Sequence, residues 1–129
     1  MQRDPRYGDV VSEVAAFLEE RLDAAVAAGV AENQICLDPG IGFGKTVEHN
    51  FELIRRLGEL TALGRPVLVG ISRKSSLGKL LGDPDAKTGT VAASVGAAVA
   101  AYERGATILR VHDVREHVEA LTAARAVYA

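Results

Sequence analysis

The stretch Asp38 to Lys45, with the sequence Asp-Pro-Gly-Ile-Gly-Phe-Gly-Lys, combines an acid, alternating glycines, an aromatic residue and a lysine. It follows the short apolar run 35–37, which is typical of a buried strand. Asp38 is therefore predicted to stand at the carboxyl end of a strand, where α/β sheets bind their ligands. The glycines permit positive φ angles and let a flat ligand approach the backbone. The stretch indicates either a ligand-binding loop or a flexible connection with a solvated aspartate.

Two phosphate-binding motifs do not fit this loop. A P-loop requires a glycine five positions before Gly-Lys-Thr, and that position holds Pro39, which has no N–H to donate. Gly40, Gly42 and Gly44 form G-x-G-x-G, whereas a dinucleotide fingerprint has G-x-G-x-x-G. The loop therefore predicts a carboxylate above a glycine-rich backbone.

Polar residues also follow the second apolar run, 67–71, which is predicted to be a buried strand. Two cations and three serines come next, and a short helix is predicted from Ser75 to Leu81. Ser75 and Ser76 then lie at the N-terminus of that helix, where free N–H groups favour an anion. Ordinary helix capping beside two solvated cations is the alternative interpretation.

The third apolar run, 107–111, ends in the same way. Arg110 and His112 are two positions apart, so they point to the same side of an extended chain. A guanidinium beside an imidazole suits a phosphate or diphosphate, although a satisfied surface pair has the same pattern. Asp113 and Glu116 have the spacing of a capping box, which predicts the start of the last helix.

Helical periodicity separates the three runs. It predicts a helix over 10–28, with Asp9 as the cap and Phe17 on the buried stripe, and a second helix from Thr46 or Asn50 to Leu60. A third helix is predicted from Gly89 to Arg104, with Thr88 as the cap. The last is predicted from Asp113 to Val127, with an apolar stripe of Val114, Val118, Leu121 and Val127. The helix from Gly89 to Arg104 is rich in small residues and is predicted to pack on two sides. His49 and His117 fall on helical faces and are predicted to be solvated.

This alternation predicts the fold class. Three parallel strands, each apolar throughout and each followed by a helix, have the layout of a segment of a (β/α)8 TIM barrel. Three strands cannot close a barrel that needs eight. We therefore expect an α/β chain that corresponds to part of a larger barrel.

Composition bounds the class of protein. The 129 residues are 48% hydrophobic with a net charge of −2, which is typical of one globular unit. The basic residues are scattered among acidic ones, so nucleic acid is not a predicted partner. The longest weakly polar run, 91–102, is shorter than the roughly 20 residues of a membrane span. The single cysteine, Cys36, is predicted to be buried; with no disulfide and no apolar leader, a cytoplasmic protein is expected.

Three strand-end motifs together resemble the dihydropteroate synthase family: 38–45, Gly70 to Ser75 (Gly-Ile-Ser-Arg-Lys-Ser) and Arg110 to Val114 (Arg-Val-His-Asp-Val). The resemblance implies that residues 1–129 form a partial pterin-binding barrel domain, from helix five to helix eight with strands six to eight. It implies a transferase of folate biosynthesis, a sulfonamide target, that joins 6-hydroxymethyl-7,8-dihydropterin diphosphate to 4-aminobenzoate and releases diphosphate. Met1-Gln2 and Pro5 resemble the loop after the fifth strand of the family.

The resemblance also implies substrate-binding roles for individual residues. Asp38 and Lys74 match the pterin ligands, since a carboxylate can accept paired N–H donors from a 2-amino-pyrimidinone edge and an ammonium can donate to its ring oxygen and nitrogen. Phe43 and Ser75 match the aminobenzoate pocket, as an apolar wall and as a carboxylate donor. Gly70 belongs to the same substrate-binding set.

Arg110 and His112 match the diphosphate-binding pair of the family. Their positive charge is expected to stabilise the leaving group while the aniline nitrogen attacks the carbon that carries it. No side-chain nucleophile is needed. The predicted catalytic residues are therefore Asp38, Lys74, Arg110 and His112, and no metal ligand is predicted within the chain.

The resemblance further implies groups outside this chain, including the ligands of Mg²⁺ and the other half of the pocket. Because catalysis depends on holding both reactants in near-attack geometry, little or no synthase activity is expected of the 129 residues alone. A homodimer through the helix from Gly89 to Arg104 and the last helix is also implied. Two alternatives are a related pterin-binding methyltransferase, against which 72–75 and 110–112 argue, and a noncatalytic half-barrel that acts only by association.

Overall fold

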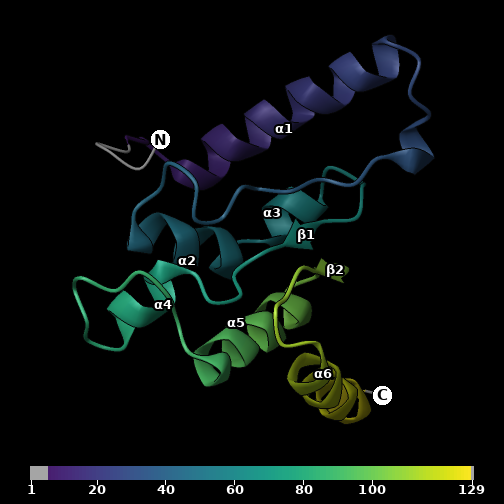
Figure 1. Ribbon diagram of the computed structural model, residues 1–129. Coiled ribbons are helices and arrows are strands. Elements are labelled where there is room, and N and C mark those ends of the chain that lie inside the picture. The colour runs from purple at the N-terminus through teal and green to yellow at the C-terminus, as the bar shows by residue number, and fades with distance from the viewer. Residues whose placement is uncertain (1–5, 129) are drawn as a thin grey trace.

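The computed structural model describes residues 6–128 as an α/β chain of helices around short parallel strands (Figure 1). In chain order the elements are the helix α1 (Val10–Ala27), the 3-10 helix η1 (Glu32–Gln34), α2 (Val47–Arg55), α3 (Gly58–Thr61), the strand β1 (Leu68–Val69), α4 (Ser75–Leu80), α5 (Val91–Glu103), β2 (Ile108–Leu109) and α6 (Val114–Tyr128). β1 and β2 lie between α1, at the top of Figure 1, and α6, at the bottom. Met1-Gln2 and Pro5 lie outside the described residues.

The extended segments are parallel neighbours in the predicted order, but they are shorter than predicted. β1 pairs with β2 in a register that places Leu68 opposite Ile108. The first predicted strand is only an isolated parallel bridge between Leu37 and Val67, supported by a 2.8 Å hydrogen bond from Leu68 N to Leu37 O. Within residues 6–128, therefore, the prediction of three strands is realised as two short strands and one bridge.

The burial predicted for Cys36 is wrong, and a second apolar side chain of these segments is also exposed. Cys36 is exposed, and Ile108 in β2 is 41% exposed. Successive side chains of a strand alternate between the two faces of a sheet, so Cys36 and Ile108 are exposed on one face while their neighbours Leu37 and Leu109 are more buried on the other. Val67 and Val69 lie in the central segment and are 0% and 1% exposed, as predicted.

α1 has the predicted bounds, since Asp9 holds the N-cap position and Gly29 follows the helix with a φ of 102°. The Asp9 carboxylate makes no cap bond to the helix backbone; it accepts hydrogen bonds from Ser12 Oγ (2.5 Å) and Arg56 Nη1 (2.8 Å) instead. Hydrogen bonding to Arg56 and Ser12 lowers the pKa of Asp9 well below its usual range. Phe17 is 59% exposed, so its predicted burial is wrong.

A capping box starts α2 and decides between the two predicted caps. Thr46 Oγ1 accepts from His49 N and His49 Nδ1 accepts from Thr46 N, each at 3.1 Å. Thr46 is therefore the cap and Asn50 is not, and His49 is a half-buried capping residue rather than a solvated one. The predicted single helix is interrupted between Arg55 and Gly58, because glycine weakens a helix interior.

α5 begins two residues later than predicted. Thr90 is its N-cap, with Oγ1 accepting a 3.1 Å hydrogen bond from Ala93 N. Thr88, the predicted cap, donates to Arg73 O at 3.2 Å. This contact holds the connection before α5 against the residues that follow β1.

α6 packs on α5 and buries an unexpected side chain. His117 is 2% exposed, so its predicted solvation is wrong; its Nδ1 lies 2.7 Å from Asp113 O. Val114, Val118 and Val127 are 60%, 56% and 84% exposed, so most of the predicted stripe faces outward. The spacing of apolar residues predicts that this stripe is buried. The face of α6 that α5 covers is instead the one that carries His117.

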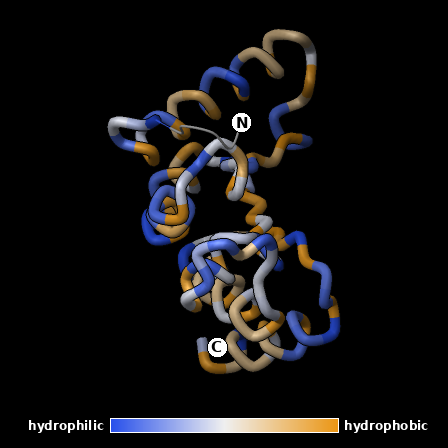
Figure 2. Tube along the Cα trace, turned by 60° about the vertical axis from the view of Figure 1, so that its left-hand side comes forward, coloured by the Kyte–Doolittle hydropathy of each residue, from blue (hydrophilic) through white to orange (hydrophobic). Residues whose placement is uncertain are grey.

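One apolar core joins α1 to the sheet and to α2, α3 and α4. Its largest fully buried apolar side chains are Ile41, Leu53, Leu57, Leu60, Ile71, Leu77, Val11, Val67 and Val69. Figure 2 shows hydrophobic and hydrophilic residues alternating along the helices, as helices with one buried face require. In the part of the chain described, no helix has the length and apolarity that crossing a membrane takes.

Replacing Gly78 by alanine is expected to destabilise the chain by about 1–3 kcal/mol through overpacking. A Cβ at Gly78 would overlap the carbonyl oxygen of Thr88 and lie 2.6 Å from Ala86 Cβ, so the loop before α5 has to move. Gly96→Ala is the matched control: Gly96 lies inside α5 with nothing within 4 Å of a built Cβ, and alanine there stabilises a helix by up to about 1 kcal/mol. Urea unfolding of both variants measures these two changes in stability. Equal unfolding midpoints for the two variants would contradict the close packing around Gly78.

Candidate functional site

The carboxyl ends of the extended segments meet at one place. Arg110 Nη1 lies 3.4 Å from Asp38 Oδ2, although 72 positions separate the two residues in the sequence. Gly70 lies against the same guanidinium, since a Cβ built there would come within 2.8 Å of Arg110 Cζ. The Asp38 and Arg110 side chains are 39% and 54% exposed. An ion pair this exposed is weak, so both groups are available to a ligand.

Lys74 lies within the electrostatic reach of the same pair. Its Nζ donates to Ile41 O at 3.0 Å and lies 4.2 Å from the centroid of the Phe43 ring. Burial lowers the pKa of Lys74, the charge of Arg110 lowers it further, and the charge of Asp38 opposes both. The predicted acid, ammonium and guanidinium therefore share one site, with Phe43 beside them.

The backbone before Lys74 has an unusual conformation that is held from several sides. Arg73 has a φ of 55°, a left-handed geometry that costs a non-glycine residue about 1–3 kcal/mol. Its N–H donates to Ser94 Oγ at 2.8 Å, its carbonyl accepts from Gly89 N at 3.0 Å, and its guanidinium pairs with Asp113 at 2.6 Å. These contacts fix the turn from which Lys74 extends. Hydrogen bonding to Arg73 also lowers the pKa of Asp113.

The glycine-rich loop closes around its own lysine. Lys45 Nζ donates to Gly40 O at 3.0 Å and to Phe43 O at 2.9 Å, and burial lowers the pKa of Lys45. Gly42 has a φ of 89°, and a Cβ there would lie 2.9 Å from Lys74 Cδ. Glycine at this position therefore allows the loop to approach Lys74, and Lys45 shapes the loop rather than extending from it as a phosphate-binding lysine does.

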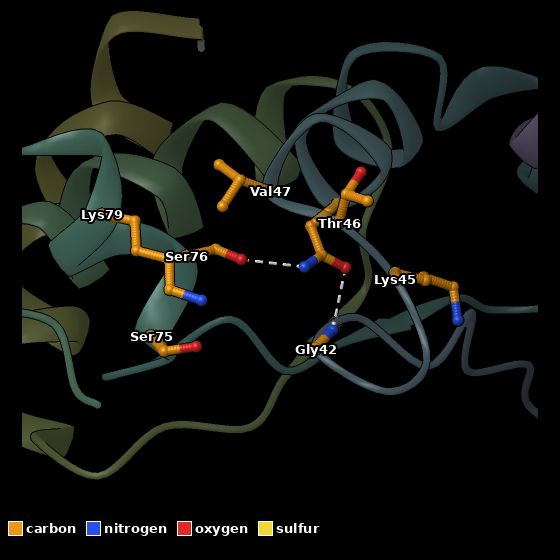
Figure 3. A pocket seen from close by; sticks show the side chains of 8 residues that line it. Gly42, Lys45, Thr46, Val47, Ser75, Ser76 and Lys79 are labelled. Carbon is orange, nitrogen blue, oxygen red and sulfur yellow. Dashed lines mark hydrogen bonds between the residues drawn. The ribbon is translucent and has the colours of Figure 1, made fainter. Parts of the chain in front are cut away.

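Two cavities flank the loop. One, of about 480 Å³, is lined by residues that include Tyr7, Phe17, Asp38, Phe43 and Lys45. The other, of about 350 Å³, lies between the loop and α4 and is lined by residues that include Gly42, Asn50, Ser75, Ser76 and Lys79 (Figure 3). Asp38 and Phe43 thus open on one side of the loop and Ser75 on the other.

His112 is placed by a serine that follows β1. Its Nδ1 lies 2.9 Å from Ser72 Oγ, and its backbone N–H donates to the same oxygen at 3.1 Å. Ser72 is 4% exposed, whereas His112 is exposed. The serine therefore joins the ends of β1 and β2 and orients the imidazole.

Sequence reasoning missed the structural importance of Asn50. The helical pattern predicts it only as a possible cap, yet it is 1% exposed and makes hydrogen bonds to Gly42 N and Ser76 Oγ. A signal was present: Asn50 shares helical spacing with the buried Leu53, Ile54 and Leu57, and a polar residue on a core-facing stripe needs partners.

The described residues do not form a metal centre of their own. No group of three or more His, Cys, Asp or Glu side chains within residues 6–128 is placed to hold a metal ion. Asp38 is engaged by Gly40 N and Arg110, and Asp113 by Arg73. These donor sets do not fit the Mg²⁺ that the family resemblance implies.

The site as a whole offers a carboxylate, an ammonium, a guanidinium and an imidazole around an aromatic ring. A carboxylate beside an ammonium can bind a planar heterocycle through both donor and acceptor edges. A guanidinium with an imidazole can bind a phosphate group. The arrangement suits a ligand that combines a nitrogen heterocycle with an anion.

Comparison with known proteins shows the family of the chain. The family model of pterin binding enzymes matches residues 1–112. A dihydropteroate synthase of Neisseria meningitidis serogroup C is 52% identical over 124 residues, which cover 95% of this chain and 44% of that protein.

Solved structures agree with the sequence comparisons. The dihydropteroate synthase of Xanthomonas albilineans in complex with 7,8-dihydropteroate superposes with a TM-score of 0.90 at 47% identity, covering 100% of this chain and 49% of that one. The structure of the same enzyme with 4-aminobenzoic acid has a TM-score of 0.90 at 49% identity, covering 97% and 45%. This chain thus spans less than half the length of these relatives and has the fold of a TIM-barrel fragment. Because the family model matches well over half of it, the chain belongs to the family of pterin-binding enzymes, and its relatives within that family are dihydropteroate synthases.

Proposed function

We propose that this chain supplies part of the active site of a dihydropteroate synthase. The reaction joins 6-hydroxymethyl-7,8-dihydropterin diphosphate to 4-aminobenzoate, giving 7,8-dihydropteroate and diphosphate. The observation that carries the proposal is the convergence of Asp38, Lys74 and Arg110 beside Phe43, at the carboxyl ends of parallel segments, in a chain 52% identical to a named synthase.

Asp38 and Lys74 bind the pterin in this proposal. The Asp38 carboxylate accepts the paired N–H donors of the pyrimidinone edge, and the Lys74 ammonium donates to the ring oxygen and nitrogen. Gly70 supports their placement because it leaves room for Arg110 beside the sheet. The complex of the Xanthomonas relative with 7,8-dihydropteroate supports a pterin ligand.

Phe43 and Ser75 bind 4-aminobenzoate in this proposal. Phe43 is 46% exposed and offers an aromatic face, and Ser75 opens α4, where backbone N–H groups are unpaired by the helix. The complex of the Xanthomonas relative with 4-aminobenzoic acid supports such a pocket. The two residues lie on either side of the glycine-rich loop, so its position determines the distance between them.

Arg110 and His112 hold the diphosphate as it leaves. A C–N bond forms between the aniline nitrogen and the pterin methylene carbon, the C–O bond to diphosphate breaks, and the nitrogen loses a proton. Positive charge fixed beside the departing oxygens stabilises the transition state. Mg²⁺ remains part of the proposal with ligands outside this chain, and it would supply further positive charge to the diphosphate.

The proposal also places the chain within a complete cytoplasmic enzyme. Residues 1–129 correspond to helix five to helix eight of the barrel, with strands six to eight. Two copies pair through α5 and α6, and exposed apolar side chains on α6 support this pairing. Val118, Val127 and Tyr128 of α6 are 56%, 84% and 62% exposed.

A hybrid enzyme tests the proposal. This chain replaces the matching segment of the Neisseria meningitidis synthase, and the product 7,8-dihydropteroate is measured by chromatography; this protein is called the hybrid synthase below. We expect activity within about tenfold of the unmodified relative, since segments that preserve near-attack geometry preserve the rate. A folded hybrid that forms no product, beside an active unmodified relative, rejects the proposal.

A further inference from the structure

Asn50 links the two backbone segments that carry the aminobenzoate side of the site. It lies in α2, and its hydrogen-bond partners are Gly42 in the glycine-rich loop and Ser76 in α4, both labelled in Figure 3. Its Oδ1 accepts a 2.9 Å hydrogen bond from Gly42 N, and its Nδ2 donates a 2.9 Å hydrogen bond to Ser76 Oγ. Asn50 and Ser76 are 1% and 5% exposed, so water does not replace these contacts easily.

The two residues that Asn50 contacts are chain neighbours of Phe43 and Ser75, the proposed walls of the aminobenzoate pocket. Gly42 is bonded to Phe43, and Ser76 is bonded to Ser75. One buried amide therefore sets the distance between the aromatic wall on the loop and the helix terminus on the other side.

The pterin side of the site is held by other contacts. Asp38 Oδ1 accepts from Gly40 N at 2.8 Å, and Asp38 Oδ2 lies 3.4 Å from Arg110 Nη1. Lys74 Nζ donates to Ile41 O at 3.0 Å. The two Asp38 contacts do not involve Asn50 and stay in place when the loop moves at Gly42, whereas Ile41 O belongs to the same peptide group as Gly42 N, so the Lys74 contact is partly coupled to Asn50.

We propose that Asn50 is a positioning residue that sets the width of the 4-aminobenzoate pocket, an inference that rests on the proposed function. In this proposal the Asn50 side chain, which is 1% exposed, acts without contacting either substrate. It acts through the backbone of Gly42 and the side chain of Ser76, and its loss separates Phe43 from Ser75.

Steady-state kinetics of the hybrid synthase tests this role. Asn50→Ala is expected to raise the KM for 4-aminobenzoate at least about tenfold and the KM for the pterin diphosphate by clearly less, because a shift near 1 Å at a positioned group is costly and Asp38 keeps its contacts. Asn33→Ala is the matched control, since Asn33 is an exposed asparagine in η1. Equal rises in both KM values, or an unchanged KM for 4-aminobenzoate, overturn the proposal.

Asn50→Asp separates positioning from stability. A carboxylate can accept from Gly42 N through one oxygen and from the Ser76 hydroxyl through the other, so both links survive even though a buried charge costs stability. The KM for 4-aminobenzoate is expected to stay within about threefold of the unmodified hybrid, while the unfolding midpoint falls. If Asn50→Asp raises this KM as much as Asn50→Ala does, the positioning role is rejected.

Failure of the proposed function can be distinguished from failure of the positioning role of Asn50. If the hybrid with the unmodified chain forms no dihydropteroate, the proposed function fails. Amide hydrogen exchange in the 129-residue chain then tests whether the Asn50 side chain holds the Gly42 amide in place. Exchange at the Gly42 amide at least about tenfold faster in Asn50→Ala than in Asn33→Ala supports the positioning contact, because exchange reports local opening. Equal rates overturn it.

Discussion

The isolated 129-residue chain is expected to form 7,8-dihydropteroate at least about 10⁴-fold more slowly than the hybrid synthase, because orienting two bound reactants is worth effective molarities of about 10⁵–10⁸ M. The chain supplies Asp38, Lys74 and Arg110, and in the proposed function the rest of the pocket comes from the remainder of the barrel. The chain covers only 44% of the Neisseria relative, which leads to the same expectation. Product formation by both proteins at equal concentration measures the ratio.

Two controls make this comparison decisive. Asp38→Asn in the isolated chain must remove any residual activity, which otherwise comes from a contaminating host enzyme. Circular dichroism at the assay temperature must show the helical content expected of α1, α5 and α6. A folded isolated chain that turns over within tenfold of the hybrid contradicts the requirement for the rest of the barrel.

In the hybrid synthase, Asp38→Asn is expected to lower kcat/KM by about 10³-fold, because a site built to hydrogen-bond a ligand loses most when a buried partner is mismatched. The asparagine amide presents an N–H donor where the pterin edge also presents donors, and it removes the charge that strengthens these bonds. It also removes the charge that faces Arg110 across 3.4 Å. Both changes are expected to lower kcat/KM.

Initial rates at varied pterin diphosphate concentration measure this loss. Asp23→Asn is the matched control, since Asp23 is an exposed aspartate on α1, away from the glycine-rich loop. The control is expected to stay within about twofold of the unmodified hybrid, as surface substitutions usually have small effects. A loss below tenfold for Asp38→Asn would exclude this carboxylate as the pterin ligand.

The sequence alone determined the order of the elements and the end of the sheet at which the site lies. Apolar runs before Asp38, Ser72 and Arg110 predicted parallel segments, and all three polar ends face one edge in the structure. These features are local or follow from chain direction: an apolar run ends at a turn residue, and parallel strands carry their carboxyl ends together. The three motifs also identified the family that the comparisons establish.

Only the tertiary structure decided which side chains these elements bury and which contacts hold the loops. His117 is buried because α5 covers its face, Cys36 is exposed on the face opposite the buried Leu37, and Arg73 keeps a positive φ because Ser94, Gly89 and Asp113 surround it. Asn50 is the sharpest case, since its partners lie 8 and 26 positions away. Helical spacing reports which residues share a face, but packing between distant segments decides what that face meets.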